Sequence, residues 1–395
     1  MKPNVLHIIN SFEQGGTERQ AVQLVRLLHE DTRYRMHLAT LSNSGILRDE
    51  AERIGLGEIR EYPLNSFYDR NFLKQIRRCV RFLKSHEIEV VHTHDFYTNI
   101  FGMTAARLAG VPVRIASKRD TQGFCSITQR RVERYLYRLA HSVITNAEAV
   151  RKQLIGEDVP PEKIITVYNG LDMKRVAPKL RLERDAVLRM LNLPNQPDRL
   201  FVTIVANVQH PVKDHATFLR AAARVHKAAP KAGFVIAGEG RLLNQLQKLA
   251  EELGIGNDAF FIGRCQHVAE LLSISKVCVL SSTAEGFSNS ILEYMAAARP
   301  VVVTDVGGAR EAVSDGETGF IVAAGDDEQM AARIVTLLHD QKRAQFMGER
   351  GRAIVEENFS CSAQVERTTA LYERLLKHHS KAVEPALKNL HRKRA

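Results

Sequence analysis

SSTAEGFSNSILEYMAAARPVVVTDVGGAREAVSDGETG, residues Ser281–Gly319, is the stretch that indicates the fold of this chain. It follows an apolar run, Val277–Leu280, that is typical of a buried strand, and it contains two glutamates, Glu285 and Glu293, with seven residues between them. Residues of the N-cap type come after Glu285, and apolar residues then recur at helical spacing. The stretch therefore predicts a strand, a loop that carries Glu285 and a helix that begins near Ser288.

The first turn of this predicted helix is a candidate anion site. Gly286 interrupts the chain, and the N–H groups of Phe287, Ser288 and Asn289 would lie at the positive end of the helix dipole. A phosphate bound there would lie between the two glutamate side chains, which could accept hydrogen bonds from hydroxyl groups on both sides of it. A nucleotide sugar has this order of groups. The alternative is that one glutamate only favours the helix start and the other is a solvated loop acid.

A second strand and loop in the same stretch support the ligand-binding interpretation. Val301–Thr304 is a short apolar run, and Gly307 and Gly308 follow it. Ligands bind at the carboxyl ends of the strands in open α/β sheets. Two glycine-containing loops would therefore border one crevice.

At these residues the chain resembles the family 4 retaining glycosyltransferases, which have the two-domain GT-B fold. The shared features, in the same order, are the spaced glutamates, the segment Gly-Gly-Ala-Arg-Glu at 307–311 and the segment Asp-Gly-Glu-Thr-Gly-Phe at 315–320. The resemblance implies an α/β protein with two Rossmann-like, doubly wound parallel-sheet domains that face a central cleft, and a C-terminal helix that crosses back to the N-terminal domain. It covers the chain up to about residue 376.

The length of 395 residues is sufficient for two domains, each with its own core. Strand-like runs alternate with helical segments, which predicts parallel sheets covered by helices on both faces. We expect an N-terminal acceptor domain at 1–172 that also includes a helix at about 358–377, a linker at 173–199, a donor domain at 200–357 and a disordered basic tail at 378–395.

The chain has 56 lysines and arginines against 45 acids, a formal net charge of +11. A nucleic-acid-binding protein is therefore one alternative, but the sequence contains no RNP-type aromatic motif, helix-turn-helix signature or metal finger. No apolar run could span a bilayer, and no signal-type leader precedes the first strand, so we expect a cytoplasmic protein. The five cysteines lack CxxC spacing, and no metal site is expected.

The first predicted strand, Val5–Ile9, leads into a glycine-rich loop. Gly15 and Gly16 permit a close approach of the backbone, and Thr17 with Gln20 predicts a capping box at the start of a helix. Because a full GxGxxG pattern is lacking, the turn is equally consistent with a purely structural role. In the family that the chain resembles, this loop faces the donor phosphates and the acceptor.

Two further strands end in polar or charged residues. Val90–Thr93 is followed by His94 and Asp95, and the resemblance implies that this segment lines the acceptor side. The alternative for such a histidine is a hydrogen-bonded structural role. The next strand ends at Lys118 and Arg119, close to the place of a family histidine near the transferred sugar. A cation there could bind donor phosphate or an anionic acceptor.

The second domain contains further candidate ligand loops. The loop after its first strand contains Asn207, His210 and Lys213, and the resemblance implies that Lys213 contacts the donor diphosphate. The family also has an arginine in this loop, and His210 stands near its place, so the sequence leaves open what supplies the second positive charge. Two other strands end near Gly238 and Arg264, beside the same crevice, and the resemblance places Arg264 near the nucleobase.

A strongly basic helix face is predicted near the middle of the first domain. Six lysines and arginines at 70–84 lie opposite an apolar face of Phe72, Leu73, Ile76, Val80 and Leu83. The simpler interpretation is a solvated surface. The alternative is attraction to anionic lipid headgroups, together with the arginines at 130–138 on another helix.

We therefore predict a retaining hexosyltransferase of class EC 2.4. It would move a hexosyl unit from a UDP- or GDP-sugar to a glycan or lipid-linked acceptor in the biosynthesis of a surface polysaccharide, a lipopolysaccharide or another glycoconjugate. Glu285, Lys213, His94 and Arg119 are the catalytic candidates, and Glu293 would bind the ribose. Lys213, helix N-termini and loop N–H groups would neutralise the leaving diphosphate without a metal or cofactor.

The alternative enzyme with the same fold is a sugar-nucleotide epimerase or a phosphorylase. The expected partners are the nucleotide sugar, the acceptor and an anionic membrane surface at its inner face, and not nucleic acid.

Overall fold

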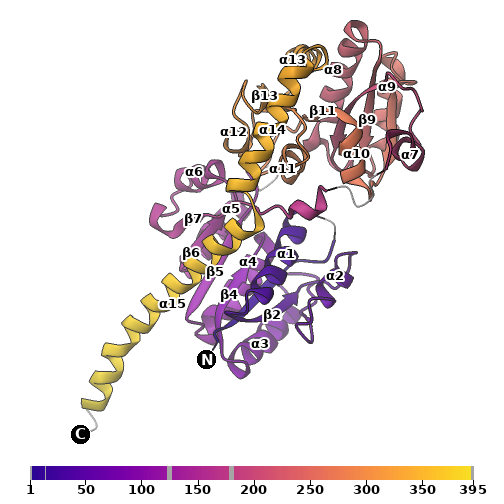
Figure 1. Ribbon diagram of the computed structural model, residues 1–395. Helices are drawn as coiled ribbons and strands as arrows, with labels where there is room; N and C mark the ends of the chain where they lie inside the picture. The colour runs from indigo at the N-terminus through magenta and orange to yellow at the C-terminus, as the bar shows by residue number, and fades with distance from the viewer. Residues whose placement is uncertain (1, 14, 122–126, 178–181, 393–395) are drawn as a thin grey trace. The chain divides into compact units, whose positions relative to one another are not determined.

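The computed structural model describes residues 2–13, 15–121, 127–177 and 182–392. The chain divides into two compact units (Figure 1). Unit 1 comprises the described parts of 1–119, 124–170 and 361–395, and unit 2 those of 120–123 and 171–360. Each unit is built around one parallel sheet with helices on both faces, so the predicted pair of doubly wound domains is confirmed.

Unit 1 contains a seven-stranded sheet in the order β3-β2-β1-β4-β5-β6-β7. Its strands are β1 (Asn4–Ile9), β2 (Arg35–Thr40), β3 (Arg60–Glu61), β4 (Ile88–Thr93), β5 (Val113–Lys118), β6 (Ser142–Thr145) and β7 (Ile164–Thr166). Its helices are α1 (Gly16–Glu30), α2 (Arg48–Glu52), α3 (Arg70–Ser85), α4 (Phe96–Ala109), α5 (Ile127–Leu139), α6 (Glu148–Gly156), the 3-10 helix η1 (Pro161–Lys163) and α15 (Cys361–Arg392).

The strands of unit 1 are continuous apolar runs in the sequence, and the central strand β1 shows the reason. Leu6 and Ile8 pack in the cluster that contains Phe101 of α4, whereas Val5 packs on the opposite face with Leu28 of α1. A parallel strand that is covered on both faces has no solvent side, so its sequence does not alternate between apolar and polar residues.

The last helix, α15, belongs to unit 1, although most of the chain before it belongs to unit 2. Leu371 and Tyr372 are buried in the core of unit 1 beside α1, which confirms that the C-terminal helix returns to the first domain. The helix is longer than predicted. The segment expected as a disordered tail at 378–395 is helical as far as Arg392, because the helix that packs on unit 1 continues without a break (Figure 1).

Unit 2 contains a six-stranded sheet in the order β10-β9-β8-β11-β12-β13. Its strands are β8 (Leu200–Val205), β9 (Ala232–Ala237), β10 (Ala259–Gly263), β11 (Ser275–Leu280), β12 (Val301–Thr304) and β13 (Gly319–Val322). Its helices are α7 (Arg184–Met190), α8 (His215–Ala228), α9 (Leu243–Glu252), α10 (Val268–Ile274), α11 (Asn289–Ala296), α12 (Ala309–Ala312), α13 (Asp327–His339) and α14 (Gln341–Asn358), with the 3-10 helices η2 (Met173–Arg175) and η3 (Pro211–Lys213).

Two local predictions were wrong. The capping box of Thr17 and Gln20 does not form, because α1 begins two residues earlier than predicted, with Gly15 as its N-cap in place of Thr17 and without a side-chain cap. Gln20 instead donates a hydrogen bond to the carbonyl of Gly170, at 3.0 Å. On α3, Leu73 was placed on the apolar face but is 55% exposed, because the helix buries Cys79 and its neighbours on that face instead.

Candidate functional site

Both sheets have a point where the strand order reverses, and the predicted site residues follow the strands at these two points. In unit 2 the neighbours are β8, followed by Lys213, and β11, followed by Glu285. In unit 1 they are β1, followed by Gly15, and β4, followed by His94. Because successive crossovers leave in opposite directions there, the two loops diverge, and ligands of open α/β sheets bind in the crevice between them.

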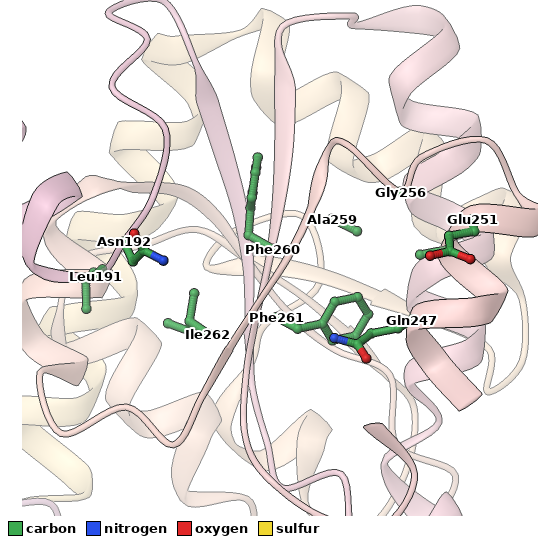
Figure 2. Close-up of a pocket in the computed structure, with 10 residues that line it drawn as sticks. Leu191, Asn192, Gln247, Glu251, Gly256, Ala259, Phe260, Phe261 and Ile262 are labelled. Atoms are coloured by element: carbon green, nitrogen blue, oxygen red, sulfur yellow. The ribbon is translucent and has the colours of Figure 1, made fainter. Parts of the chain in front are cut away.

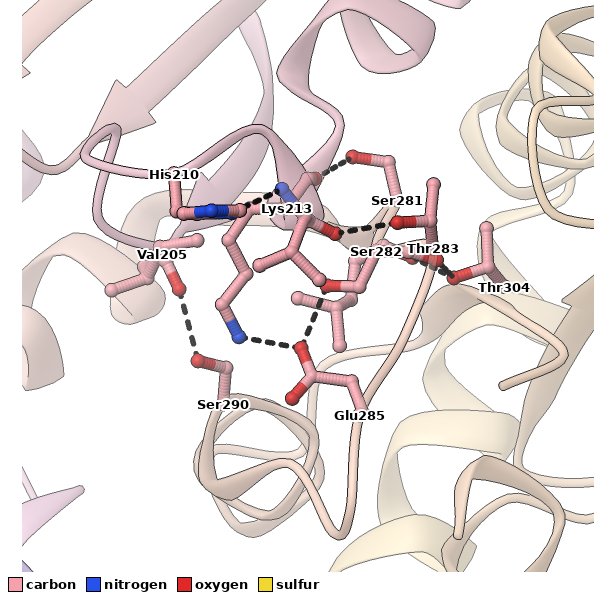
Figure 3. A network of polar contacts seen from close by, with 12 residues as sticks. Val205, His210, Lys213, Ser281, Ser282, Thr283, Glu285, Ser290 and Thr304 are labelled. Carbon is pink, nitrogen blue, oxygen red and sulfur yellow. Dashed lines mark hydrogen bonds and ion pairs between the residues drawn. The ribbon is translucent and has the colours of Figure 1, made fainter. Parts of the chain in front are cut away.

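Lys213 and Glu285 form the centre of the site in unit 2, the glutamate site (Figure 3). The Lys213 Nζ lies 2.5 Å from Oε1 of Glu285, and the same oxygen accepts a hydrogen bond from the Ser282 hydroxyl at 2.7 Å. Both side chains of the ion pair are partly exposed. The pair is therefore held in place on one side and accessible to a ligand on the other.

Backbone contacts fix the two loops that carry this ion pair. The Ser281 hydroxyl donates to the Lys213 carbonyl at 2.9 Å, and the Thr283 N–H donates to the Val212 carbonyl at 2.8 Å. The Thr304 hydroxyl at the end of β12 donates to the Ser282 carbonyl at 2.6 Å. The loops after three adjacent strands thus form one hydrogen-bonded unit around Lys213 and Glu285 (Figure 3).

The glycine pair after β12 is required by the Glu285 loop. The N–H of Gly308 donates to the Gly286 carbonyl at 2.8 Å. Gly307 has a φ of +54°, and a Cβ on it would lie 2.2 Å from the carbonyl oxygen of Glu285. A side chain at Gly307 would therefore push the Glu285 loop away from its position.

The start of α11 lies where the sequence predicted it. Ser288 is the N-cap of the helix, and its side chain makes no capping hydrogen bond. The Phe287 side chain is buried against Phe359, with ring centroids 5.2 Å apart. Glu293 is partly buried in the second turn.

Two contacts attach α11 to the end of β8. The Val205 N–H donates to the Tyr294 hydroxyl at 2.6 Å. The Ser290 hydroxyl donates to the Val205 carbonyl at 2.9 Å (Figure 3). The positive end of the helix dipole is thereby fixed beside the β8 loop, where an anion would be stabilised.

The remaining predicted donor residues lie around the same edge of the sheet. Asn207 is exposed on the β8 loop, and Nδ1 of His210 accepts the Val212 N–H at 3.3 Å. Gly238, after β9, approaches this loop so closely that a Cβ would lie 1.9 Å from the Ala206 carbonyl oxygen. Arg264 is exposed after β10, the strand at the edge of the sheet.

The structure identifies an arginine beside the β8 loop that sequence reasoning missed. Arg241 donates from Nε to the Gln209 carbonyl at 3.0 Å and from its backbone N–H to the Gln209 side chain at 3.2 Å. Arg310 is bound by both oxygens of Asp305, at 2.8 and 2.7 Å, so its guanidinium is occupied. Arg241 therefore adds a cation beside the β8 loop, although the sequence separates it from that loop.

A hollow elsewhere in unit 2 contains none of the predicted donor residues. It has a volume of about 570 Å³ and lies along the edge strand β10, between the end of α7 and α9 (Figure 2). Phe260, Phe261 and Gln247 contribute to its lining. The hollow is thus separate from the loops that carry the ion pair.

The second group of predicted residues, the arginine site, lies in unit 1. Arg119 donates from Nη1 to Oδ1 of Asn169 at 3.0 Å, and its Nη2 lies 3.4 Å from Nδ1 of His94. Lys118, the alternative cation, is buried and bound to Glu133 at 3.1 Å. Arg119 is therefore in contact with His94, another site residue, whereas Lys118 is paired with Glu133.

The loops around Arg119 are rich in charge. Burial lowers the pKa of Arg119 to about 10, while the nearby carboxylates of Glu18 and Asp95 favour its charged form. Burial also raises the pKa of Glu18, on the first turn of α1. A Cβ on Gly15 would lie 2.0 Å from the Glu18 carboxylate, so this glycine leaves room for Glu18 to fold back over the helix start.

Asp95 caps α4 by accepting the Thr98 N–H at 2.9 Å, and Thr17 and Gly16 lie in the first turn of α1. Of the residues around Arg119, sequence reasoning missed Glu18, Asn169, His7 and Tyr372. Glu18 and Asn169 had local signals, because Glu18 lies two residues after Gly16 and Asn169 directly precedes Gly170.

Three buried histidines lie next to Arg119. His94 Nε2 is 2.9 Å from His7 Nδ1, and His7 Nε2 is 3.0 Å from the Tyr372 hydroxyl. The same hydroxyl is 2.7 Å from Nδ1 of His92. Burial lowers the pKa of each histidine, that of His7 to about 3, so all three rings are neutral at pH 7.

Two family models match the chain: glycosyl transferases group 1 over residues 192–354, and Glycosyltransferase Family 4 over residues 14–175. The D-inositol 3-phosphate glycosyltransferase of Thermomonospora curvata is 30% identical over 311 residues, which cover 72% of this chain and 71% of that protein. The chain belongs to glycosyltransferase family 4. It is an enzyme of class EC 2.4 that uses a nucleotide sugar.

Solved structures of low sequence identity share the GT-B fold of this glycosyltransferase. HepE of Anabaena, in complex with UDP, has a TM-score of 0.82 at 20% identity and covers 94% of this chain and 100% of its own. The lipopolysaccharide outer core galactosyltransferase WaaB has a TM-score of 0.71 at 15% identity.

A galactosyltransferase of Escherichia coli is closer in sequence than these two structures. The UDP-Gal:α-D-GlcNAc-diphosphoundecaprenol α-1,3-galactosyltransferase is 26% identical over 313 residues, which cover 76% of this chain and 79% of that protein. Among the described residues of the family 4 enzyme, no helix combines the length and the apolar character needed to cross a membrane.

We predict that Gly307→Ala disrupts the glutamate site. The new Cβ would meet the Glu285 carbonyl, and displacement of the loop by about 1 Å can reduce a rate on the order of 100-fold. Gly316→Ala is the matched control, because Gly316 also has a positive φ, of +78°, but has no atom within 4 Å of the new Cβ. Both variants should lose stability in denaturant unfolding, whereas only Gly307→Ala should lose glycosyl transfer. Equal transfer by both variants would contradict this role of Gly307.

We also predict that the stability of unit 1 falls in acid. Each buried histidine has a lowered pKa in the native state, so below about pH 6.5 the unfolded chain binds more protons than the folded one. The free energy of unfolding is not reduced by these histidines above pH 6.5. Below that pH it falls by about 1.4 kcal/mol per pH unit for each histidine, down to the native pKa, which for His7 is about 3.

Denaturant unfolding between pH 8 and pH 4.5 measures this slope. His7→Gln should reduce it, and His29→Gln, on the exposed surface of α1, should not. A slope that is the same in both variants would show that the buried rings do not control the acid response.

Proposed function

We propose that this enzyme is a retaining hexosyltransferase that takes its sugar from a UDP- or GDP-sugar and transfers it to a glycan or lipid-linked acceptor in the biosynthesis of a surface polysaccharide or glycoconjugate. The observation that carries the proposal is the ion pair of Lys213 and Glu285 beside the start of α11 at the reversal point of the unit 2 sheet. A cation, a carboxylate and a helix N-terminus at one place suit a ligand with both phosphate and hydroxyl groups.

The donor would rearrange this ion pair. A diphosphate at the start of α11 offers Lys213 an anionic partner, and Glu285, still held by Ser282, is then free to accept hydrogen bonds from hydroxyl groups of the sugar. Lys213 and the helix dipole would stabilise the charge that develops on the leaving diphosphate without a metal ion. Glu293, one helical turn into α11, would accept hydrogen bonds from the ribose.

The nucleobase would lie toward the ends of β9 and β10, near Gly238 and Arg264, and Arg241 would supply the second positive charge that the β8 loop lacks. Relatives support this class of donor. HepE has been solved with UDP-glucose, and the Escherichia coli galactosyltransferase is named for a UDP-galactose donor.

Unit 1 would bind the acceptor. Thr17, Asp95 and Arg119 lie at the loops that follow β1, β4 and β5, with Gly15 and Gly16 at the start of α1. The leaving phosphate would assist the acceptor hydroxyl on the same face of the sugar, as the family resemblance implies. A separate carboxylate nucleophile is therefore not needed.

A lipid-linked acceptor would require contact with a membrane. The six basic residues of α3 are all exposed: Arg70, Lys74, Arg77, Arg78, Arg81 and Lys84. An aromatic patch lies next to the start of this helix, where Tyr68 is 93% exposed and Phe67 stacks on exposed Tyr97 at 5.7 Å. Exposed aromatic residues beside a basic face suit peripheral binding to anionic lipid, at the cytoplasmic side where we place the enzyme.

The proposed function is tested by a thermal-shift screen of nucleoside diphosphates and their sugars, because specific binding raises the apparent stability. The ligand that binds should then be released as free nucleoside diphosphate only when an acceptor is present. Release with phosphate alone, or conversion of the sugar without an acceptor, would indicate a phosphorylase or an epimerase instead.

We predict that Lys213→Ala and Glu285→Ala each reduce transfer by on the order of 100- to 1,000-fold, since each removes one preorganised charge contact worth about 2.7–4 kcal/mol. Both should fold, because both side chains are partly exposed. Glu293→Ala should chiefly weaken nucleotide binding. Initial rates, measured in EDTA, and nucleotide titrations are the assays. Lys248→Ala and Glu252→Ala, an exposed pair on α9, are the controls.

Turnover close to that of the controls in both Lys213→Ala and Glu285→Ala would rule out this donor site. Transfer that stops in EDTA and returns only with added Mg²⁺ or Mn²⁺ would contradict the metal-free mechanism.

We predict that the full-length enzyme sediments with anionic but not with neutral liposomes, and that rising salt releases it. Each lysine or arginine near an anionic surface contributes about 1 kcal/mol, which is screened beyond a Debye length of about 8 Å. Arg77→Glu with Arg81→Glu should weaken binding to the liposomes but not to the nucleotide. Arg350→Glu with Arg352→Glu, on α14 of unit 2, is the control. If the wild type ignores anionic liposomes at low salt, a soluble acceptor becomes the better proposal.

A further inference from the structure

The histidines of unit 1 belong to a continuous chain of hydrogen bonds across the sheet. It joins Arg119 to His94 of the β4 loop, His94 to His7 of β1, His7 to Tyr372 of α15 and Tyr372 to His92 of β4. The last step joins His92 Nε2 to the Ser117 hydroxyl, at 2.9 Å. The six members of this chain, which we call the relay, are therefore Arg119, His94, His7, Tyr372, His92 and Ser117.

The geometry gives every bond of the relay one direction. A guanidinium can only donate, so Nδ1 of His94 is an acceptor, and in a neutral ring Nε2 then carries the proton. The same argument makes His7 accept at Nδ1 and donate from Nε2 to the Tyr372 oxygen. Tyr372 must therefore donate its own proton to His92, which in turn donates to Ser117. The charge of Arg119 thus fixes three ring tautomers in succession.

This pattern accounts for all six ring nitrogens of the three histidines. The rings lie close enough together to hold a metal ion. However, each nitrogen already has a hydrogen-bond partner, and a neighbouring guanidinium would repel a second cation. The cluster is therefore better explained as a support for Arg119 than as a metal centre.

The hydrogen-bond partners of Arg119 are neutral, and the nearby carboxylates of Glu18 and Asp95 act on it through their charge. Its two hydrogen-bonded nitrogens contact the amide oxygen of Asn169 and the neutral ring of His94, and its Nε is buried without a hydrogen-bond partner. Within the described part of the chain, no carboxylate is close enough to Arg119 to form an ion pair with it. An immobilised guanidinium with unused donors is well suited to bind a phosphate or a carboxylate in a two-pronged manner.

We propose that Arg119 binds an anionic phosphate-type group of a substrate, and that His94, His7, Tyr372 and His92 are positioning residues that hold its guanidinium in the required orientation. The proposal rests on the proposed function for the identity of that substrate. The anion is either the diphosphate of the donor or a phosphate carried by the acceptor. Because Tyr372 belongs to α15, the last helix of the chain contributes to binding without touching the substrate.

Two titrations distinguish the sources of the anion. UDP, or GDP if UDP does not bind, is titrated into the free enzyme, and inorganic phosphate is titrated into the enzyme saturated with that nucleotide. If Arg119 binds the donor, Arg119→Gln weakens nucleotide binding about tenfold or more, since each lost charge-assisted contact has about that effect. If it binds the acceptor phosphate, nucleotide binding is unchanged, and the binding of inorganic phosphate is lost. Arg119→Lys should not restore binding, because an ammonium group lacks the planar fork.

Tyr372→Phe tests the relay, since it removes one hydroxyl and little volume. We expect it to weaken the same titration that depends on Arg119, and the double variant Tyr372→Phe/Arg119→Gln to be no weaker than Arg119→Gln alone. Tyr34→Phe is the matched control, because Tyr34 is also buried beside α15 but lies outside the relay. Ring ¹⁵N shifts should report Nε2–H tautomers for the three histidines in the wild type and a changed His94 ring in Arg119→Gln. His92→Gln serves in place of Tyr372→Phe if that variant fails to fold.

The proposal is overturned if Arg119→Gln leaves both titrations unchanged, or if Tyr372→Phe behaves like Tyr34→Phe while remaining folded. It is also overturned if the effects of Tyr372→Phe and Arg119→Gln simply add. Failure of the proposed function looks different. The wild type would then bind neither UDP nor GDP. The role of Arg119 would still be tested by titrating inorganic phosphate into the nucleotide-free wild type and into Arg119→Gln, and by comparing the two affinities.

Discussion

The organisation of both units depends on the geometry of parallel sheets. Neighbouring parallel strands need long crossover connections, and all strands end at the same edge of the sheet. Where the order reverses, at β1 with β4 and at β8 with β11, the following loops separate and leave their helix starts and side chains accessible. The residues that we place in both sites occupy these two edges, so the backbone topology selects the positions and the local sequence selects the chemistry.

The two sites treat their positive charge differently. Lys213 is balanced by a carboxylate at 2.5 Å, whereas Arg119 is held by an amide and a neutral ring. Glu285 is also hydrogen-bonded to Ser282, so Lys213 can exchange Glu285 for a substrate anion at little electrostatic cost. The Arg119 guanidinium has neutral hydrogen-bond partners, and the carboxylates of Glu18 and Asp95 act on it only through their charge. A bound anion would therefore add the ion pair that the site lacks, which favours its occupancy.

The sequence was informative wherever the signal was local. Ser288 was predicted as the helix start, and Gly307 as a loop glycine, because both roles depend on a few neighbouring residues. The capping box at Thr17 failed because the backbone at Gly15 offered an earlier start for the helix. The relay could not be predicted, since His7 and Tyr372 are 365 residues apart and only the return of α15 brings them together. Arg241 was missed for the same reason, because only the packing of two loops places it beside Gln209.

The two ends of the main segment of unit 2 lie side by side. Leu171 donates its N–H to the Phe359 carbonyl at 2.8 Å and pairs with Ser360, and the chain then enters α15 of unit 1. In topological terms unit 2 is an insertion into unit 1. The residues of unit 2 are therefore all synthesised before those of unit 1 are complete, because the core of unit 1 includes Tyr372 of α15. A truncation before α15 would therefore remove core residues of the first unit and none of the second.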